Sequence, residues 1–430
     1  MVTTNSIEVT TSDSGARQPS SGVMRRNALR LLAGNAVYTA CQWGMLVALT
    51  RFTNVPDVGR FALAFAVTAP VFLLTGLRLR TTLVTDTHHK YRYADFAFAR
   101  LGSNAAGFLL LTVYIIGTGA SPSTTELILL VGLAKAFEAC SDLIYGEWQQ
   151  RGLLDRVALS MALRGAASLA IFVAVVSAGY GARGGCWALA SVWGIAFLCD
   201  LRYSKFVDHA TWSGIHWQNL RCGRLIRNTV PLGLGAMLAS LQSNVPRFFV
   251  ERYLGVAHLA LFAAAAWPAL AGNLVVNAVA ESACARLAHC HASPGHSGFA
   301  SLLTRLSLAG LALGLAGAAV AALAGYRLLG LFYPAEYAGA ARVLTILMVA
   351  AALANVASFL HYGMVSAGRF TSQMTVMIAT SAATLLSSLI LIPRFGLEGA
   401  GLAVIVAMLV QITGSVAALH KELLGGSSPV

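Results

Sequence analysis

Apolar residues follow one another in twelve long runs, separated by short polar segments. About 20 mainly apolar residues form a helix long enough to cross the hydrocarbon core of a bilayer. The runs therefore predict twelve membrane-spanning helices, at residues 29–50, 58–79, 98–118, 126–148, 157–178, 184–204, 226–248, 257–282, 302–324, 339–362, 371–392 and 397–419. The fold class that follows is an all-α polytopic membrane protein.

Composition supports this fold class. The chain is 57% hydrophobic and 11% charged, and its mean hydropathy is +0.70. Soluble domains carry roughly 25% charged residues, so a chain of soluble domains is excluded. The net charge of +13 lies in short loops between apolar runs, which indicates a membrane surface and not nucleic acid as its partner. The seven Cys are odd in number and lie mostly in apolar runs, which argues against a disulfide framework.

The distribution of Lys and Arg predicts the orientation, because cytoplasmic loops are enriched in both. With the N-terminus inside, 21 of the 30 basic residues fall in inner segments, including Arg100 and Arg164, and 8 fall in outer segments. Lys135 lies within a span. Both termini are therefore expected in the cytoplasm.

A polar segment separates the first six predicted spans from the last six. Short similarities relate the two halves, for example YGEWQQRG at 145–152 and YGMVSAGR at 362–369. They indicate two six-helix bundles in a parallel repeat, with a central cavity between them. The expected domains are a disordered cytoplasmic tail at 1–24, bundles at 25–204 and 226–420, a cytoplasmic interfacial linker at 205–225 and a cytoplasmic tail at 421–430.

One predicted span, 126–148, carries three charges on one helical face: Lys135, Glu138 and Asp142. A charge at the centre of a spanning helix costs ~2.5–3.5 kcal/mol, so this face must meet protein or water. Two readings remain open: an ion pair that locks neighbouring helices, or a site for a coupling cation or an anionic headgroup. Because two carboxylates share one ammonium, one of them is expected to hold a proton during transport.

Further polar residues recur at helical spacing and predict a hydrated cavity. Asn273, Asn277 and Glu281 follow one another at i, i+4 and i+8, and similar stripes run through Asn35–Gln42 and Asn355–Tyr362. Amide side chains can also bridge helices structurally. Arg78, Arg80 and Arg247 lie near helix ends, where they either anchor the chain or clamp a diphosphate through bidentate hydrogen bonds.

The sequence holds none of the enzyme motifs sought. Nucleophile-elbow, Walker and HExxH patterns are all absent. The segment 284–296 contains Cys284, His289, Cys290, His291 and His296, but their spacing matches no standard zinc site. We therefore expect no enzyme activity, no metal and no cofactor. Transport would run on an ion gradient or on the gradient of the substrate.

Three segments carry a resemblance to a known family: residues 30–70, EWQQRGLLDRVALSMALRGA at 147–166, and PRFGLEGAGLAVIVA at 393–407. In these the chain resembles the O-antigen and exopolysaccharide flippases of the multidrug/oligosaccharidyl-lipid/polysaccharide (MOP) exporter superfamily. The resemblance implies a transporter of the bacterial inner membrane that moves an undecaprenyl-diphosphate-linked oligosaccharide to the periplasmic leaflet. It also implies polysaccharide polymerase and export proteins as partners, and a cationic cavity.

The candidate site residues follow from both lines of reasoning. For substrate binding they are Arg78, Arg80, Lys135, Arg247, Asn273 and Asn277; for ion coupling they are Glu138, Asp142 and Glu281. Two other functions stay open. One is an H⁺- or Na⁺-coupled multidrug antiporter of the same superfamily, and the other is a membrane scaffold that holds a polysaccharide-assembly complex without transporting.

Overall fold

The computed structural model describes residues 21–86, 88, 90–204, 221–293 and 298–424. Most of the predicted N-terminal tail, most of the predicted linker, and residues 425–430 of the C-terminal tail lie outside these residues. Every regular element of the described chain is helical. The elements are α1 (Ser21–Phe52), α2 (Val55–Thr75), α3 (Leu79–Thr85), α4 (Tyr93–Thr118), α5 (Pro122–Gln150), α6 (Leu154–Val175), η1 (Val176–Tyr180), α7 (Gly181–Tyr203), α9 (Cys222–Leu254), α10 (Val256–Ala292), α11 (Phe299–Phe332), η5 (Ala335–Ala340), α12 (Ala341–Ser366) and α13 (Phe370–Leu424).

The predicted all-helical membrane fold is confirmed. Seven helical stretches of the described chain are long and apolar enough to span a membrane. Two of them, 154–203 and 370–420, have 50 and 51 residues. At about 1.5 Å per residue each is longer than two bilayer cores, so each accommodates two crossings. The breaks between the crossings fall at glycines with positive φ, Gly179 (φ 92°) and Gly396 (φ 59°). The total of twelve crossings stays a prediction.

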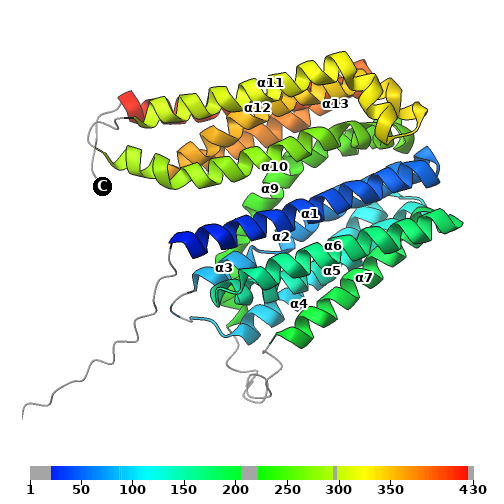
Figure 1. The fold of residues 1–430 in the computed structure, drawn as a ribbon, viewed down its shortest axis with the longest axis horizontal. Helices are drawn as coiled ribbons and strands as arrows, with labels where there is room; N and C mark the ends of the chain where they lie inside the picture. Colours follow the sequence, from blue (N-terminus) through cyan, green and yellow to red (C-terminus); the bar gives the residue numbers. More distant parts are fainter. Residues whose placement is uncertain (1–20, 87, 89, 205–220, 294–297, 425–430) are drawn as a thin grey trace, which may run out of the picture.

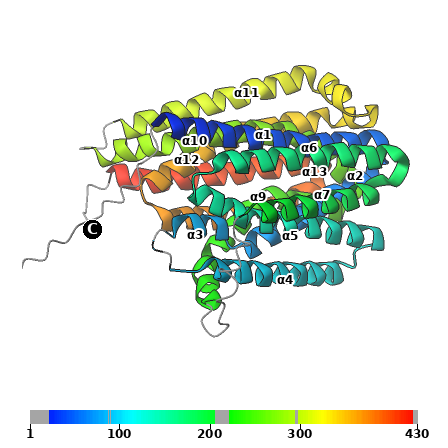
Figure 2. The ribbon, with the colours of Figure 1, turned by 60° about the horizontal axis from the view of Figure 1, so that its bottom comes forward.

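The helices form two halves that lie side by side (Figure 1). Helices α1–α7 make up the N-terminal half, and α9–α13 pack together in the C-terminal half. Helix α2 connects the two, because it packs against both α9 and α10. Figure 2 shows the long helices running roughly parallel in both halves.

The two halves are packed tightly at one end of the molecule, here called the closed end. A single apolar core there joins α2 and α5 to the first turns of α10 and α12. Gly59 permits this contact, because a Cβ at this position would lie 1.8 Å from the carbonyl oxygen of Val256. Trp43 Nε1 also donates to Tyr333 Oη across the halves, at 2.9 Å.

Toward the opposite end, where α1 begins and α13 ends (Figure 1), two smaller cores are separate from this one. One packs α10, α11, α12 and α13 around Phe359, and the other packs α3, α4 and α5 around Phe96 and includes Leu225 at the start of α9. The orientation predicted from Lys and Arg would place this end in the cytoplasm.

Candidate substrate cavity

A cavity of about 720 Å³ lies between the two halves, and we call it the central cavity. Helices α2, α3, α5 and α6 form most of its wall, α1 and α4 contribute one residue each, and α10 contributes one residue from the C-terminal half. Five cationic side chains and three carboxylates line it: Arg78, Arg80, Arg100, Lys135, Arg164, Glu138, Asp142 and Glu281. The lining therefore has an excess of positive charge.

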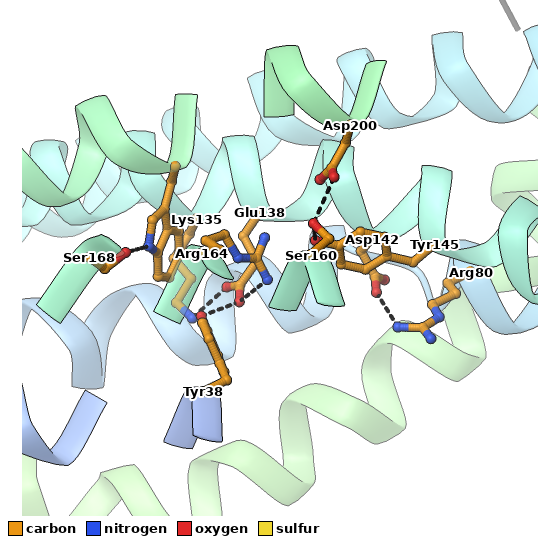
Figure 3. Close-up of polar contacts among 11 residues, drawn as sticks. Tyr38, Arg80, Lys135, Glu138, Asp142, Tyr145, Ser160, Arg164, Ser168 and Asp200 are labelled. Atoms are coloured by element: carbon orange, nitrogen blue, oxygen red, sulfur yellow. Dashed lines mark hydrogen bonds and ion pairs between the residues drawn. The ribbon is translucent and has the colours of Figure 1, made fainter. Parts of the chain in front are cut away.

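The charged face of α5 points into this cavity, with Glu138 at the centre of an ion cluster (Figure 3). Tyr38 Oη donates to Glu138 Oε1 at 2.6 Å, and Lys135 Nζ donates to Oε2 at 2.7 Å. Arg164 Nη2 lies 3.6 Å from Oε1. These four residues, Tyr38, Lys135, Glu138 and Arg164, form what we call the α5 ion cluster. The cluster neutralises Glu138 and ties α5 to α1 and α6.

Arg164 and Arg100 line the cavity, and the sequence analysis did not select them, since it counted both among the basic residues of the inner segments. Arg164 lies well inside α6 and only 3% of it is exposed. Its guanidinium carbon lies 5.2 Å from the Tyr38 ring centre and 5.4 Å from that of Trp193. Such cation–π contacts compensate in part for lost hydration. Arg100 lies inside α4 and donates to the carbonyl oxygen of Gly76 at 3.2 Å.

A second ion pair in the cavity joins α3 to α5. Arg80 Nη1 donates to Asp142 Oδ1 at 2.9 Å, and Arg80 Nε and Nη2 donate to Gln149 Oε1 at 3.3 and 3.1 Å. Gly146 permits the approach, because a Cβ there would lie 3.2 Å from Arg80 Cγ. A break in the backbone between α2 and α3 sets the direction of α3, the helix that carries Arg80. At this break Leu77 and Arg78 take positive φ values of 53° and 49°. Such conformations are strained for residues other than glycine.

Behind the cavity, a chain of hydrogen bonds extends the polar interior of the N-terminal half. Tyr145 Oη and Ser160 Oγ are 2.7 Å apart, and Ser160 Oγ donates to Asp200 Oδ1 at 2.7 Å (Figure 3). Asp200 is 4% exposed. A polar residue near the end of an apolar run is a weak sequence signal, and the sequence analysis did not select it.

The four other predicted site residues do not all lie in the central cavity. Glu281 lines the central cavity and has no ion pair among the described residues. Arg247, Asn273 and Asn277 do not line it. Arg247 Nη1 donates to Asn244 Oδ1 at 3.3 Å, and Asn277 Oδ1 accepts from Ser358 Oγ at 2.5 Å.

The structure corrects the expectation for Asn355, one residue of the polar stripe at 355–362. It was expected to face a shared hydrated cavity, but it is 4% exposed and donates to the carbonyl oxygen of Gly310 at 3.0 Å. It bridges α12 to α11, because amide groups within a membrane satisfy their hydrogen bonds on neighbouring helices.

The Cys- and His-containing segment shows no metal site in the part of the chain that the structure describes, where no group of three or more His, Cys, Asp or Glu side chains gathers. His296 lies outside that part. All seven cysteines are free, as the sequence analysis expected.

Comparison with known proteins bears on this geometry. No protein-family model matches the chain. It is 24% identical over 393 residues to the capsular polysaccharide biosynthesis protein CapF of Staphylococcus aureus, which covers 90% of this chain and 97% of that protein. An inward-facing multidrug resistance MATE family transporter of the MOP superfamily matches with a TM-score of 0.67 and 14% identity, over 91% of this chain and 96% of that one.

An outward-facing structure of a MATE family transporter gives a TM-score of 0.62 at 16% identity, over 93% of this chain and 96% of that one. The chain has the fold of a MOP-superfamily transporter. The fold implied by the resemblance in the sequence is thereby confirmed. The described chain therefore has the fold of a multi-pass membrane protein, and one relative is named for polysaccharide biosynthesis.

Proposed function

We propose that this MOP-fold transporter flips a diphosphate-linked oligosaccharide, carried on an undecaprenyl lipid, from the cytoplasmic to the periplasmic leaflet. The observation that carries the proposal is the cationic excess of the central cavity. Guanidinium and ammonium groups in a cavity of low dielectric attract phosphate oxygens strongly. The polysaccharide link of the relative CapF supports the same substrate class.

Within the cavity, Arg78, Arg80 and Lys135 are the cations that a bound headgroup can reach. Arg78 is exposed, and the side chains of Arg80 and Lys135 are 22% and 19% exposed. Arg164 and Arg100 are buried beneath them and contribute through their charge. Asn35 on the same wall offers an amide to sugar hydroxyls.

An apolar groove on α1 supports a substrate with a long hydrocarbon tail. The groove measures about 610 Å³ and runs between α1 and helices α10, α11 and α12. Trp43, Trp267, Val320 and Met348 are among the residues that line it. Since α1 borders both this groove and the central cavity, one lipid-linked molecule can place its headgroup in the cavity and its tail in the groove.

The multidrug antiporter is the second candidate, because the matching structures include multidrug transporters. The positive excess of the cavity disfavours it, since cationic drugs would be repelled. Ion coupling also stays a prediction. Glu281 suits that role best, because Glu138 and Asp142 are already held by cations.

The test measures flipping in liposomes. The purified protein is reconstituted with a fluorescent undecaprenyl-diphosphate oligosaccharide, and the leaflet of the label is read by quenching from outside. We expect flipping by the wild type and at least a tenfold lower rate for the double variant Arg80→Gln/Lys135→Met. Arg183→Gln is the matched control, because Arg183 pairs with Glu126 outside the central cavity. Equal rates in wild-type and protein-free liposomes would overturn the proposal.

A further inference from the structure

Two of the cations of the central cavity are already paired with carboxylates of α5. Lys135 Nζ lies 2.7 Å from Glu138 Oε2, and Arg80 Nη1 lies 2.9 Å from Asp142 Oδ1. A phosphate oxygen can reach Lys135 or Arg80 through an N–H that the carboxylate does not hold, but it then lies beside that carboxylate, and two anions at one cation repel each other. An anion that binds in this cavity therefore competes with Glu138 and Asp142 for the two cations.

The Lys135–Glu138 pair has a reserve partner that makes this exchange possible. Arg164 Nη2 lies 3.6 Å from Glu138 Oε1, which is longer than a hydrogen bond. Arg164 Nε and Nη1 are buried and have no hydrogen-bond partner among the described residues. When Lys135 turns to a phosphate, Glu138 keeps its bond from Tyr38 and can close onto Arg164. The carboxylate is then never left buried without a counter-charge.

The Arg80–Asp142 pair can open for a different reason. The Asp142 side chain is 39% exposed and lines the cavity, so cavity water can solvate it after Arg80 leaves. Arg80 stays positioned meanwhile, because Gln149 Oε1 accepts from its Nε and Nη2. One guanidinium edge is thus fixed, and the other is free to change its acceptor.

We propose that Glu138 and Asp142 are internal competitors of the anionic headgroup. They hold Lys135 and Arg80 while the cavity is empty, are displaced when the diphosphate binds, and recapture the cations when it leaves. The idea rests on the proposed function. It explains why a cavity for an anion contains carboxylates: unpaired cations would bind the diphosphate too tightly to release it, and transport needs binding weak enough to reverse.

The inference predicts opposite effects on affinity and turnover. The probe is inorganic pyrophosphate, and its binding to the purified full-length protein is measured by titration calorimetry. Glu138→Gln and Asp142→Asn should each bind pyrophosphate at least fivefold more tightly than the wild type. The same variants should flip the lipid-linked substrate more slowly, because release is impaired. Glu126→Gln, which removes a carboxylate paired with Arg183 outside the cavity, should change neither quantity.

A double variant separates competition from net charge. Arg164→Met/Glu138→Gln has the same net charge as the wild type, yet Lys135 has lost its competitor. We expect it to bind pyrophosphate more tightly than the wild type; wild-type affinity would mean that net charge alone acts, and would overturn the inference. If Glu138→Gln does not fold, Asp142→Asn decides, since its site is more exposed.

The outcomes also separate this inference from the proposed function. Pyrophosphate binding that is present but unchanged or weaker in the carboxylate variants would overturn the inference and leave the flippase proposal standing. Failure of the wild type and of every variant to bind pyrophosphate would contradict the proposed function itself.

Discussion

Helix α5 of the N-terminal half and helix α12 of the C-terminal half correspond in the internal repeat predicted from the sequence, and their surroundings differ. Where α5 has Lys135, Glu138 and Asp142, the predicted repeat places Ala352, Asn355 and Phe359 on α12. The three α5 residues line the central cavity. The three α12 residues are at most 4% exposed and pack against α11.

Glycines on α11 account for the difference. A Cβ on Gly314 would lie 2.3 Å from Ala352 Cα, and one on Gly310 would lie 2.8 Å from the Phe359 ring. The two backbones therefore approach too closely for long charged side chains. The comparison teaches that one half carries the charged site and the other is a tightly packed apolar partner, although both halves have similar helices.

The largest effect is expected from moving a charge into the packed half. Ala352→Lys would place an ammonium group and four methylenes at a fully buried position. Overpacking costs ~1–3 kcal/mol and a charge inside the membrane ~2.5–3.5 kcal/mol, so little folded protein should accumulate. Yield after size-exclusion chromatography measures this. Ala352→Ser is the control and should fold; normal yield of Ala352→Lys would show that α12 has room for charge.

A smaller loss of stability is expected from removing the centre of the α5 ion cluster. Glu138→Gln leaves Lys135 and Arg164 without their carboxylate, and hydrogen bonds to charged groups contribute ~1.5–3 kcal/mol. Thermal unfolding in detergent should therefore occur at lower temperature. Adding Lys135→Met should recover part of the loss, because it removes one uncompensated charge. An unchanged unfolding temperature in the single variant would mean that the cluster contributes nothing to stability.

The packing of the C-terminal half can be tested with a smaller change. Gly314→Ala adds one methyl group against Ala352, and we expect destabilisation by ~1–3 kcal/mol. Gly330→Ala is matched, because Gly330 lies on the same helix with no atom within 4 Å of a new Cβ. That control should be neutral or slightly stabilising, since Ala favours helix over Gly by up to ~1 kcal/mol. Equal effects at the two positions would contradict the packing argument.

The smallest effect is expected at the exposed edge of the charged half. Arg78→Gln removes an exposed cation of the central cavity while Arg80, Lys135 and Arg164 remain. Because solvent screens exposed charges, we expect about a twofold to threefold slower flipping in liposomes and no change in unfolding temperature. A complete loss would show that Arg78 is the principal headgroup contact.

The sequence predicts much of this architecture, because long apolar runs specify spanning helices. It also predicts the charged face of α5, since three charges at helical spacing inside an apolar run must meet protein or water. It does not predict Arg164 or Arg100 as site residues, because an Arg in the first turns of an apolar run cannot be told from an anchoring charge without the packing of the neighbouring helices. Nor does it predict that Asn355 bridges two helices, since that depends on the close approach at Gly310.

The central claim is that the cationic cavity of the N-terminal half binds the diphosphate of a lipid-linked substrate. The most direct measurement compares binding of an undecaprenyl-diphosphate oligosaccharide and an uncharged lipid-linked oligosaccharide to the purified protein. The account predicts at least tenfold tighter binding of the diphosphate form, and loss of this preference in Arg80→Gln/Lys135→Met. Equal binding of the two lipids by the wild type would contradict it.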